Sequence, residues 1–186
     1  MFRQVAFATL FLIASLGCAN QQVPLYQIDM IVFTHLNSSQ TPAQNNLAPP
    51  QAPNLAEAIL LQINTSDKMT PYRILPTSAS HLRDEYWAMN RKPQYQILFH
   101  YSWLQPINNQ RPVALSLTNT GGWNIEGTLR VRHSNYYLLD TELLFSAPDS
   151  EQAAFVFAQK QRMKPGVIYY LDHPQAGMLI KAHPIT

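Results

Sequence analysis

The C-terminal stretch, residues 160–184, most constrains the fold of this chain. Three segments rich in β-forming side chains are separated there by two turn-forming sequences, Lys164-Pro165-Gly166 and residues 172–177. The segments are residues 155–163, 167–171 and 178–182. Strands joined in this way are not stable alone in water, because one face of their sheet needs cover. The rest of the chain is therefore expected to supply more strands and a helix that close the core.

Two upstream segments are predicted to be strands. Residues 26–33 begin as an alternation and end wholly apolar, which is typical of a strand that enters the middle of a sheet. Residues 95–104 also alternate. We expect Trp103, at the end of this segment before Gln105 and Pro106, to be half exposed. The face expected in the core carries Tyr95, Ile97, Phe99, Tyr101 and Trp103.

A hairpin is predicted farther along the chain. Residues 125–131 alternate cleanly, His133-Ser134-Asn135 forms a turn, and residues 136–145 return. This pairing would set two arginines near two acids across the hairpin, which indicates charge pairing on a solvated sheet face. These residues are Arg130 and Arg132 on one strand and Asp140 and Glu142 on the other.

The clearest helix spans residues 78–90, where Thr77 or Ser78 can cap it and Pro93 ends it. Residues 54–61 fit either a short helix or an apolar strand. Residues 37–53 hold four prolines and are expected to form a long exposed loop. The sequence therefore predicts an α+β fold, a single domain with a mainly antiparallel twisted sheet of about six to eight strands covered by one or two helices. The face of the helix expected on the core carries Leu82, Tyr86 and Met89.

Residues 1–19 have the pattern of a secretory signal, with Arg3 before an apolar run and small residues after it. Cleavage after Ala19 would release residues 20–186 as a soluble exported domain. The alternative is a lipoprotein signal that ends at Cys18, which would then carry a lipid anchor. The apolar run is too short to span a membrane, and no later stretch is long enough. A single cysteine allows no disulfide within the fold.

The charge balance argues against strongly anionic partners such as nucleic acid or an anionic membrane. The chain has a formal net charge of +2, only 13% of its residues are charged, and removal of residues 1–19 takes away only Arg3. A nearly neutral surface has no electrostatic footprint for nucleic acid or for an anionic membrane. The many amide and hydroxyl side chains suit neutral partners that form hydrogen bonds.

No sequence motif indicates catalysis. The chain lacks nucleophile motifs such as G-x-S-x-G. Glu126 and Glu142 could form the acid–base pair of a glycosidase, but both lie on polar strand faces beside arginines, which favours a structural role. We therefore predict a protein that is not an enzyme and uses no metal or cofactor. Its six histidines do not fall at metal-ligand spacing in the sequence, at positions 35, 81, 100, 133, 173 and 183.

Two blocks of the chain resemble the CsiV family, exported proteins of proteobacteria that are described as peptidoglycan-binding. The first is the block from Tyr95 to Pro106, which includes His100, Trp103 and Gln105. The C-terminal block resembles the family more specifically. Its matching residues are Arg162, Met163, Lys164, Gly166, Tyr170, Asp172, His173, Pro174 and Gly177.

The resemblance implies a non-catalytic periplasmic cell-wall factor. Such a protein would bind peptidoglycan, support cell shape, and contact the penicillin-binding synthase machinery through an outer-membrane activator. The alternative is an envelope assembly protein or lipoprotein that contacts only proteins. Asp172, Pro174 and Gly177 are predicted to form a turn, in which Asp172 accepts hydrogen bonds from the amides that follow it. The candidate ligand-binding residues are His100, Trp103, Gln105, Arg162, Tyr170 and His173.

Overall fold

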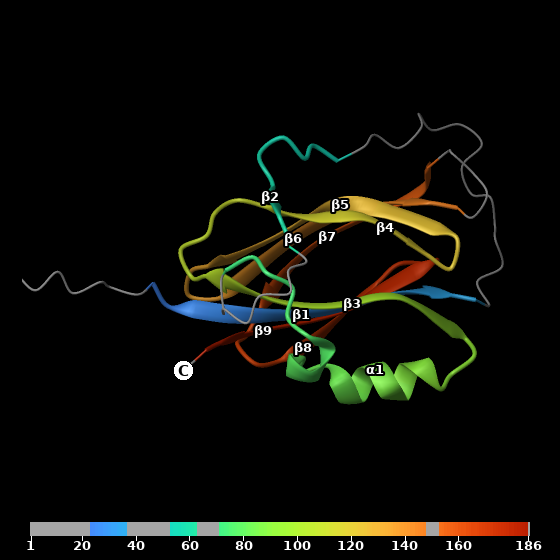
Figure 1. Cartoon of the computed structure of the whole chain (residues 1–186), viewed down its shortest axis with the longest axis horizontal. Helices are drawn as coiled ribbons and strands as arrows, with labels where there is room; N and C mark the ends of the chain where they lie inside the picture. The colour runs from blue at the N-terminus through green and yellow to red at the C-terminus, as the bar shows by residue number, and fades with distance from the viewer. Residues whose placement is uncertain (1–22, 37–52, 63–70, 148–152, 186) are drawn as a thin grey trace, which may run out of the picture.

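The computed structural model describes residues 23–36, 53–62, 71–147 and 153–185, whose strands form two sheets (Figure 1). Sheet A has the strand order β3-β1-β9-β8, and sheet B has the order β2-β4-β5-β6-β7. Neighbouring strands are antiparallel, apart from the short parallel pair β2 and β4. The predicted signal, Cys18 and residues 37–52 of the predicted loop lie outside the described residues. The strands are β1 (Leu25–His35), β2 (Ile59–Leu60), β3 (Tyr95–Pro106), β4 (Val113–Thr120), β5 (Trp123–His133), β6 (Tyr137–Ser146), β7 (Ala153–Met163), β8 (Ile168–Asp172) and β9 (Ala176–Pro184).

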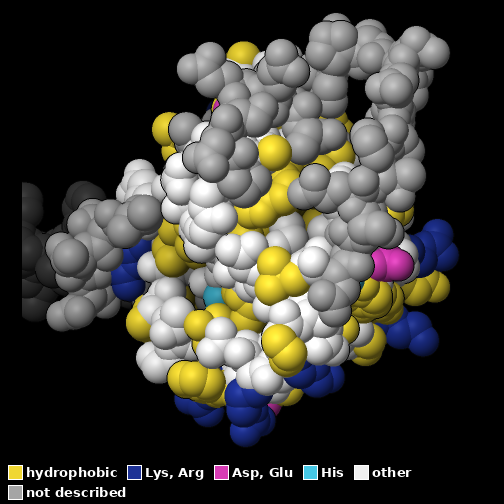
Figure 2. Space-filling view, turned by 90° about the vertical axis from the view of Figure 1, so that its right-hand side faces the viewer, with side chains coloured by type: hydrophobic (Ala, Val, Ile, Leu, Met, Phe, Trp, Pro, Cys, Tyr) yellow, Lys and Arg dark blue, Asp and Glu magenta, His cyan; other side chains and the backbone are white. Residues whose placement is uncertain are grey.

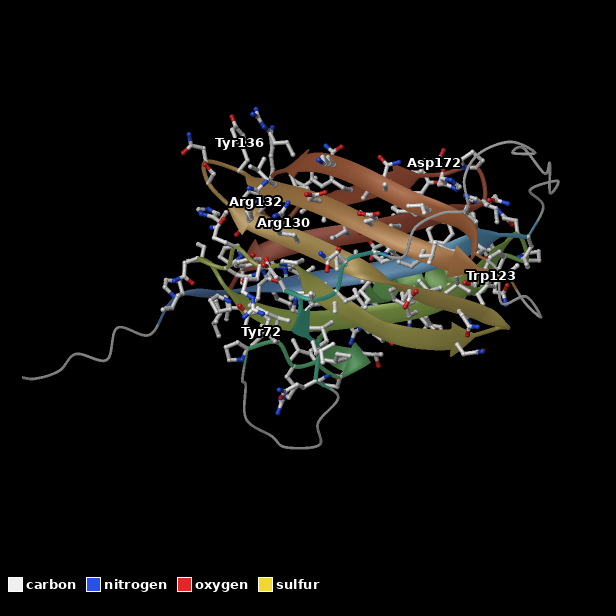
Figure 3. All side chains as sticks on the ribbon, turned by 90° about the horizontal axis from the view of Figure 1, so that it is seen from above. Tyr72, Trp123, Arg130, Arg132, Tyr136 and Asp172 are labelled. Atoms are coloured by element: carbon white, nitrogen blue, oxygen red, sulfur yellow. The ribbon has the colours of Figure 1, made fainter. Side chains whose placement is uncertain are left out.

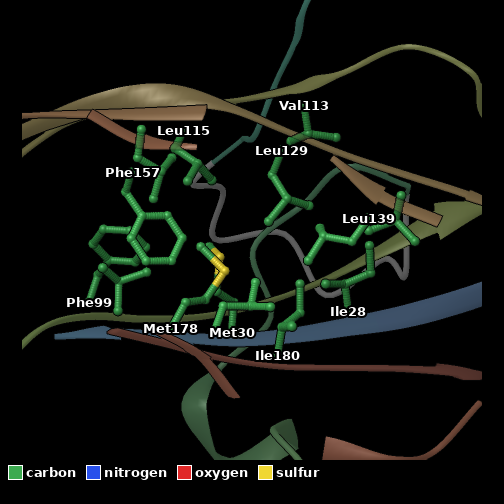
Figure 4. Close-up of a cluster of buried hydrophobic side chains, with 14 of the residues drawn as sticks. Ile28, Met30, Phe99, Val113, Leu115, Leu129, Leu139, Phe157, Met178 and Ile180 are labelled. Atoms are coloured by element: carbon green, nitrogen blue, oxygen red, sulfur yellow. The ribbon is translucent and has the colours of Figure 1, made fainter. Parts of the chain in front are cut away.

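The sheets pack face to face, and helix α1 (Arg83–Asn90) covers part of the outer face of sheet A, which gives three layers (Figure 1). The main core lies between the sheets, where Met30 and Met178 of sheet A meet Leu115 and Phe157 of sheet B (Figure 4). Each such side chain stabilises the fold by about 1.5–3 kcal/mol when it is fully buried. A smaller cluster between sheet A and α1 contains Ile31, Phe33, Leu82 and Met89.

The prediction of antiparallel strands is confirmed, but the prediction of one sheet is wrong. The described residues contain nine strands and one α-helix, so the protein is richer in β structure than predicted. An open sheet of so many strands twists strongly, and division into two packed sheets covers an apolar face of each. Strand β1 lies inside sheet A and is buried along nearly its whole length, as the sequence predicted for a central strand.

The C-terminal segments are strands, as predicted, but they do not all pair with one another. Strand β7 pairs with β6 in sheet B, whereas β8 pairs with β9 in sheet A. The turn at Lys164-Pro165-Gly166 therefore carries the chain from one sheet to the other. Gly166 has a φ of 72° there, a left-handed conformation that glycine adopts without strain. Turn chemistry alone does not distinguish such a crossing from a hairpin.

Strand β3 contains a bulge that changes which side chains share a face. Val32 pairs with Phe99 and Phe33 pairs with Ile97, so Leu98 is the extra residue. Tyr95 and Ile97 consequently pack in the cluster beside α1, whereas Phe99 and Trp103 lie in the main core. The prediction of one continuous core face along residues 95–104 is therefore wrong.

The predicted helix begins later than expected. Residues Thr77–Ala79 form a short 3-10 turn, η1, and α1 begins at Arg83. Ser80 Oγ accepts a hydrogen bond from the Leu82 amide (3.1 Å), whereas Thr77 and Ser78 do not cap the helix. The predicted apolar face is confirmed, because Leu82 and Met89 are buried and Tyr86 packs beside them.

Two smaller predictions are also resolved. Within the ambiguous residues 54–61, only Ile59–Leu60 form a strand, and Asn54 Oδ1 accepts a hydrogen bond from the Ala56 amide (3.0 Å) in the preceding turn. The hairpin of β5 and β6 is confirmed, and Arg130 lies opposite Asp140.

Within the described ranges, no helix combines the length and apolar character that a membrane crossing requires.

Candidate functional site

A cluster of polar side chains lies on the outer face of sheet A, the face that α1 partly covers. Asp29, in the middle of β1, is 0% exposed and lies opposite Ser102 of β3 and Lys181 of β9. Its Oδ1 atom accepts hydrogen bonds from Ser102 Oγ (2.5 Å) and from Gln27 Nε2 (2.8 Å). Gln27 Nε2 also donates to the Ala79 carbonyl oxygen (2.8 Å), which fixes the residues before α1 onto β1.

Two histidines face the other oxygen of this carboxylate. Asp29 Oδ2 lies 3.5 Å from His81 Nδ1 and 3.7 Å from His183 Nδ1. The two imidazole rings meet edge to face, with their centroids 4.0 Å apart and an interplanar angle of 68°. His81 comes from the segment before α1, and His183 comes from the last strand. Three segments that are distant in the sequence therefore converge on one buried carboxylate.

Burial sets the ionisation of the histidines on this face. It lowers the pKa of His183, and the neighbouring His81 lowers it further, while Asp29 opposes both effects. Burial likewise lowers the pKa of His100, again against the effect of Asp29. Both imidazoles are therefore neutral near pH 7, with lone pairs that can accept a proton or bind a cation.

A groove, here called the α1 groove, lies between α1 and the outer edge of β3 and has a volume of about 670 Å³. Such a volume falls within the range of small-molecule sites, about 300–1,000 Å³. In a view rotated by 90° from Figure 1, apolar patches surround hollows in the surface, and Lys and Arg side chains follow its lower edge, at the level of α1 (Figure 2). The polar and aromatic lining residues include Ser78, Arg83, Tyr86, Trp87, Asn90 and His100.

His100 connects the α1 groove with the buried cluster. Its ring stacks on Tyr86 (centroids 5.1 Å apart), and its Nε2 forms a hydrogen bond with Ser80 Oγ (2.7 Å). Ser80 immediately precedes His81 of the cluster. Trp87 is 56% exposed and its ring meets that of Tyr86 edge to face, so the groove presents aromatic surface beside polar groups.

The structure does not bring the six predicted ligand-binding residues together. Trp103 is 0% exposed, so the expectation that it is half exposed is wrong. Its Nε1 donates to Gln105 Oε1 (3.1 Å), and Gln105 Nε2 donates to the Tyr26 hydroxyl and to the Val131 carbonyl oxygen. Tyr26 also donates to Val131 (2.7 Å). This buried network joins the two sheets at the end of β3.

The other predicted residues are dispersed. Arg162 lies on the outer face of sheet B, with its guanidinium 4.4 Å from the centroid of the Tyr136 ring. Tyr170 lies on the outer face of sheet A, stacked on Phe33 at 6.2 Å. His173 stacks on Phe155 at 4.7 Å. Only His100 borders the α1 groove.

The predicted turn at residues 172–177 forms, but its side chains have other roles. His173 Nδ1, and not Asp172, accepts a hydrogen bond from a following amide, that of Gln175 (3.2 Å). The Asp172 carboxylate instead accepts a hydrogen bond from the Tyr170 hydroxyl (2.5 Å) and lies 3.8 Å from His35 Nε2. Pro174 is exposed within the turn. Gly177 belongs to β9, and a Cβ atom there would lie 2.4 Å from Phe33 Cζ.

The cluster of Asp29, His81 and His183 was not predicted from the sequence. The alternation in residues 26–33 places Asp29 on a polar face, but it does not show that a helix covers that face. The histidines lie on different elements, so spacing along the chain could not reveal their approach. The only local signal was an aspartate within a strand that was otherwise predicted to be central and apolar.

The fold and the groove together define a protein with two packed sheets and a groove suited to ligand binding. Comparison with known families gives the particular family. The family model described as "Peptidoglycan-binding protein, CsiV" matches residues 5–185, so the chain belongs to the CsiV family, as its sequence motifs indicated. Searches of curated proteins and of solved structures found no match.

Proposed function

We propose that this protein binds peptidoglycan in the α1 groove and acts by binding, without catalysing a reaction. The observation that carries the proposal is membership of a family described as peptidoglycan-binding over nearly the whole chain. The chain also has a groove of suitable size beside its only described helix. The family description names the ligand, and the groove suggests where the ligand binds.

The chemistry of the α1 groove suits a glycan with attached peptides. The exposed ring of Trp87 can stack on the apolar face of a sugar, and Tyr86 widens that surface. Ser78 and Asn90 offer hydrogen-bonding groups for hydroxyls and amides. Arg83 can form a bidentate pair with a carboxylate of a stem peptide. Each feature matches a different part of peptidoglycan.

The placement of Glu126 and Glu142 supports a role in binding. Both lie on the outer face of sheet B, where Glu126 is opposite Leu144 and Glu142 is opposite Thr128. The α1 groove is lined mainly by α1, the segment before it and β3. Neither of the two carboxylates that the sequence offered as an acid–base pair lines this groove.

The proposed location is the periplasm, where the protein would support peptidoglycan synthesis and cell shape. There it would contact the penicillin-binding synthase machinery through an outer-membrane activator. It would be soluble after cleavage behind Ala19, or anchored through a lipid on Cys18. Mass spectrometry of the N-terminus of the exported protein distinguishes these two forms.

The binding proposal is tested by sedimentation of the purified protein with insoluble peptidoglycan. We expect the protein to pellet with the polymer and to release no soluble fragments. Trp87→Ala should weaken retention about tenfold, equivalent to about 1.4 kcal/mol. Tyr136→Ala is the matched control, because Tyr136 is another exposed aromatic residue but lies beside Arg162 on sheet B. This control should sediment like the parent protein.

Three outcomes contradict the proposal. If the parent protein stays in solution but co-purifies with envelope proteins, the alternative of an assembly protein with only protein partners is correct. If both variants lose retention equally, the protein binds peptidoglycan, but the α1 groove is not the site. Release of soluble fragments by the parent protein would instead show catalysis.

A further inference from the structure

We propose that Asp29, His81 and His183 form a binding site for a divalent transition-metal ion of the zinc class. The site is separate from the proposed peptidoglycan contacts of the α1 groove. It would join β1, the segment that precedes α1, and the last strand, β9.

The distances between the three side chains fit a single ion. One ligand atom from each residue lies within 4.8 Å of the others, and Asp29 Oδ2 is 3.5 Å and 3.7 Å from the two Nδ1 atoms. Zinc bonds to nitrogen and oxygen are about 2.1 Å long, so two ligands at a tetrahedral angle lie about 3.4 Å apart. The two separations from Asp29 Oδ2 are close to this value, and the third, between the histidine nitrogens, is at most 4.8 Å.

Three buried polar atoms of the cluster also form no hydrogen bond. Asp29 Oδ2 is buried without a hydrogen bond, and neither ring nitrogen of His183 forms one among the described residues. A buried carboxylate oxygen and a buried imidazole are costly when they are unsatisfied. A cation between them would satisfy the carboxylate and both rings together.

The residues around the cluster hold the carboxylate in place for a ligand role. Ser102 and Gln27 both donate to Oδ1, which leaves Oδ2 directed at the histidines. Hydrogen bonds of this kind orient metal ligands in proteins. The His81 side chain is 50% exposed and that of His183 is 15% exposed, so an ion can enter from the His81 side.

The donor set selects the kind of metal. Two imidazoles and one carboxylate favour zinc and its neighbours, whereas magnesium and calcium prefer a shell of oxygen atoms. Three protein ligands leave a fourth position for water or for a group from a partner. Because Ser80 binds His100 and precedes His81, an ion here would also steady one wall of the α1 groove.

The test is a calorimetric titration of the untagged purified protein with Zn²⁺ after treatment with a chelator. We expect one Zn²⁺ per chain and a rise in melting temperature on binding. His81→Gln and Asp29→Asn should each weaken binding by about 100-fold or more. That loss exceeds the roughly 10- to 100-fold expected for Ser102→Ala, which removes only a hydrogen bond to a ligand. His133→Gln, at an exposed histidine on the other sheet, is the matched control and should bind like the parent.

Absence of saturable Zn²⁺ binding by the folded parent protein would overturn the proposal. The cluster would then be a set of histidine–carboxylate contacts without an ion. Equal binding by the parent and by His81→Gln would also overturn it, because the ion would be held elsewhere. His81→Gln keeps the test decisive if Asp29→Asn does not fold, since His81 is half exposed and its replacement leaves the buried hydrogen bonds of Asp29 intact.

Discussion

The outer faces of the two sheets carry polar side chains in the same alternating pattern but use them differently. On sheet A, helix α1 and its preceding segment adjoin the face, and Asp29 is buried among histidines, a serine and a glutamine. On sheet B, the described residues leave the face open. Arg130 pairs there across the strands with Asp140 at 2.6 Å. Where α1 and its preceding segment cover a sheet, polar side chains on the strands are buried and held in position. Where the face is open, charged side chains remain in contact with water.

Charged and aromatic side chains on the open face of sheet B also contact one another. Arg130, Arg132 and Tyr136 lie toward one end of sheet B, far from Trp123 at the other end (Figure 3). Arg162 stacks on Tyr136, and Lys160 lies opposite Asp140. Two of the arginines on this face therefore have partners within the protein. On sheet A, by contrast, Asp29 Oδ2 is buried and forms no hydrogen bond, although two histidines face it.

The largest expected difference between the faces is in packing. Leu82→Ala should lower the free energy of unfolding by about 2–5 kcal/mol, because Leu82 is fully buried between sheet A and α1. Leu138→Ala, a matched change on the outer face of sheet B, should cost less than about 1 kcal/mol. Urea unfolding followed by circular dichroism measures both. Equal losses would show that the open face is covered.

A second prediction concerns the close approach of Phe33 and Gly177 on sheet A. Gly177→Ala should destabilise the protein by about 1–3 kcal/mol, because the new methyl group would meet the Phe33 ring and Tyr170 Cε2. Replacement of Phe33 by Leu in the same chain should recover part of this loss, since the two residues share one space. The measurement is a double-mutant cycle by urea unfolding. Additive effects would contradict a steric cause.

Much of the fold was predictable because its signals are local. Period-two alternation identified β1, β3 and β5, turn residues identified the β5–β6 hairpin, and apolar spacing identified the core face of α1. The division into two sheets was not predictable, because a turn such as Lys164-Pro165-Gly166 does not reveal which strand its neighbour pairs with. The bulge at Leu98 was equally hidden, since it depends on the register with β1.

The candidate site was less predictable than the fold. Trp103 and Gln105 are the kinds of residue that bind ligands, yet they form a buried network with Tyr26 across the sheets. Asp29, His81 and His183 meet only after β1 and β9 pair and the segment before α1 docks on them. Spacing along a chain reports contacts within one element, and this site has one residue from each of three.

A third prediction uses the ionisation of His100 beneath α1. Burial lowers the pKa of His100 below its ordinary value of 6.5. The unfolded chain therefore takes up a proton at a higher pH than the folded protein does. The stability that depends on neutral His100 is complete above pH 6.5 and falls as the pH drops from 6.5 toward the folded pKa.

The pH effect is measured by urea unfolding near pH 7.5 and near pH 5.5, with a chelator present. His100→Gln should reduce the difference between the two conditions but not abolish it, because the pKa values of His173 and His183 are lowered as well. His133→Gln, on sheet B, should leave the difference unchanged. A parent protein that is more stable near pH 5.5 than near pH 7.5 would contradict this prediction.

The smallest effect is expected on the open face of sheet B. Arg130→Ala and Asp140→Ala, alone and together, should give a coupling energy of about 0.2–1 kcal/mol, because both side chains are partly exposed and water screens the pair. The coupling should decrease further at high salt, since exposed charges are screened. The corresponding cycle for Ser102→Ala and Asp29→Asn on sheet A should resist salt, because both groups are buried. If the Arg130–Asp140 coupling were as large and as independent of salt as that of the buried pair, the face of sheet B would be shielded by something the described residues do not include. Cover by α1 would then no longer account for the difference between buried Asp29 on sheet A and the solvated charge pair on sheet B.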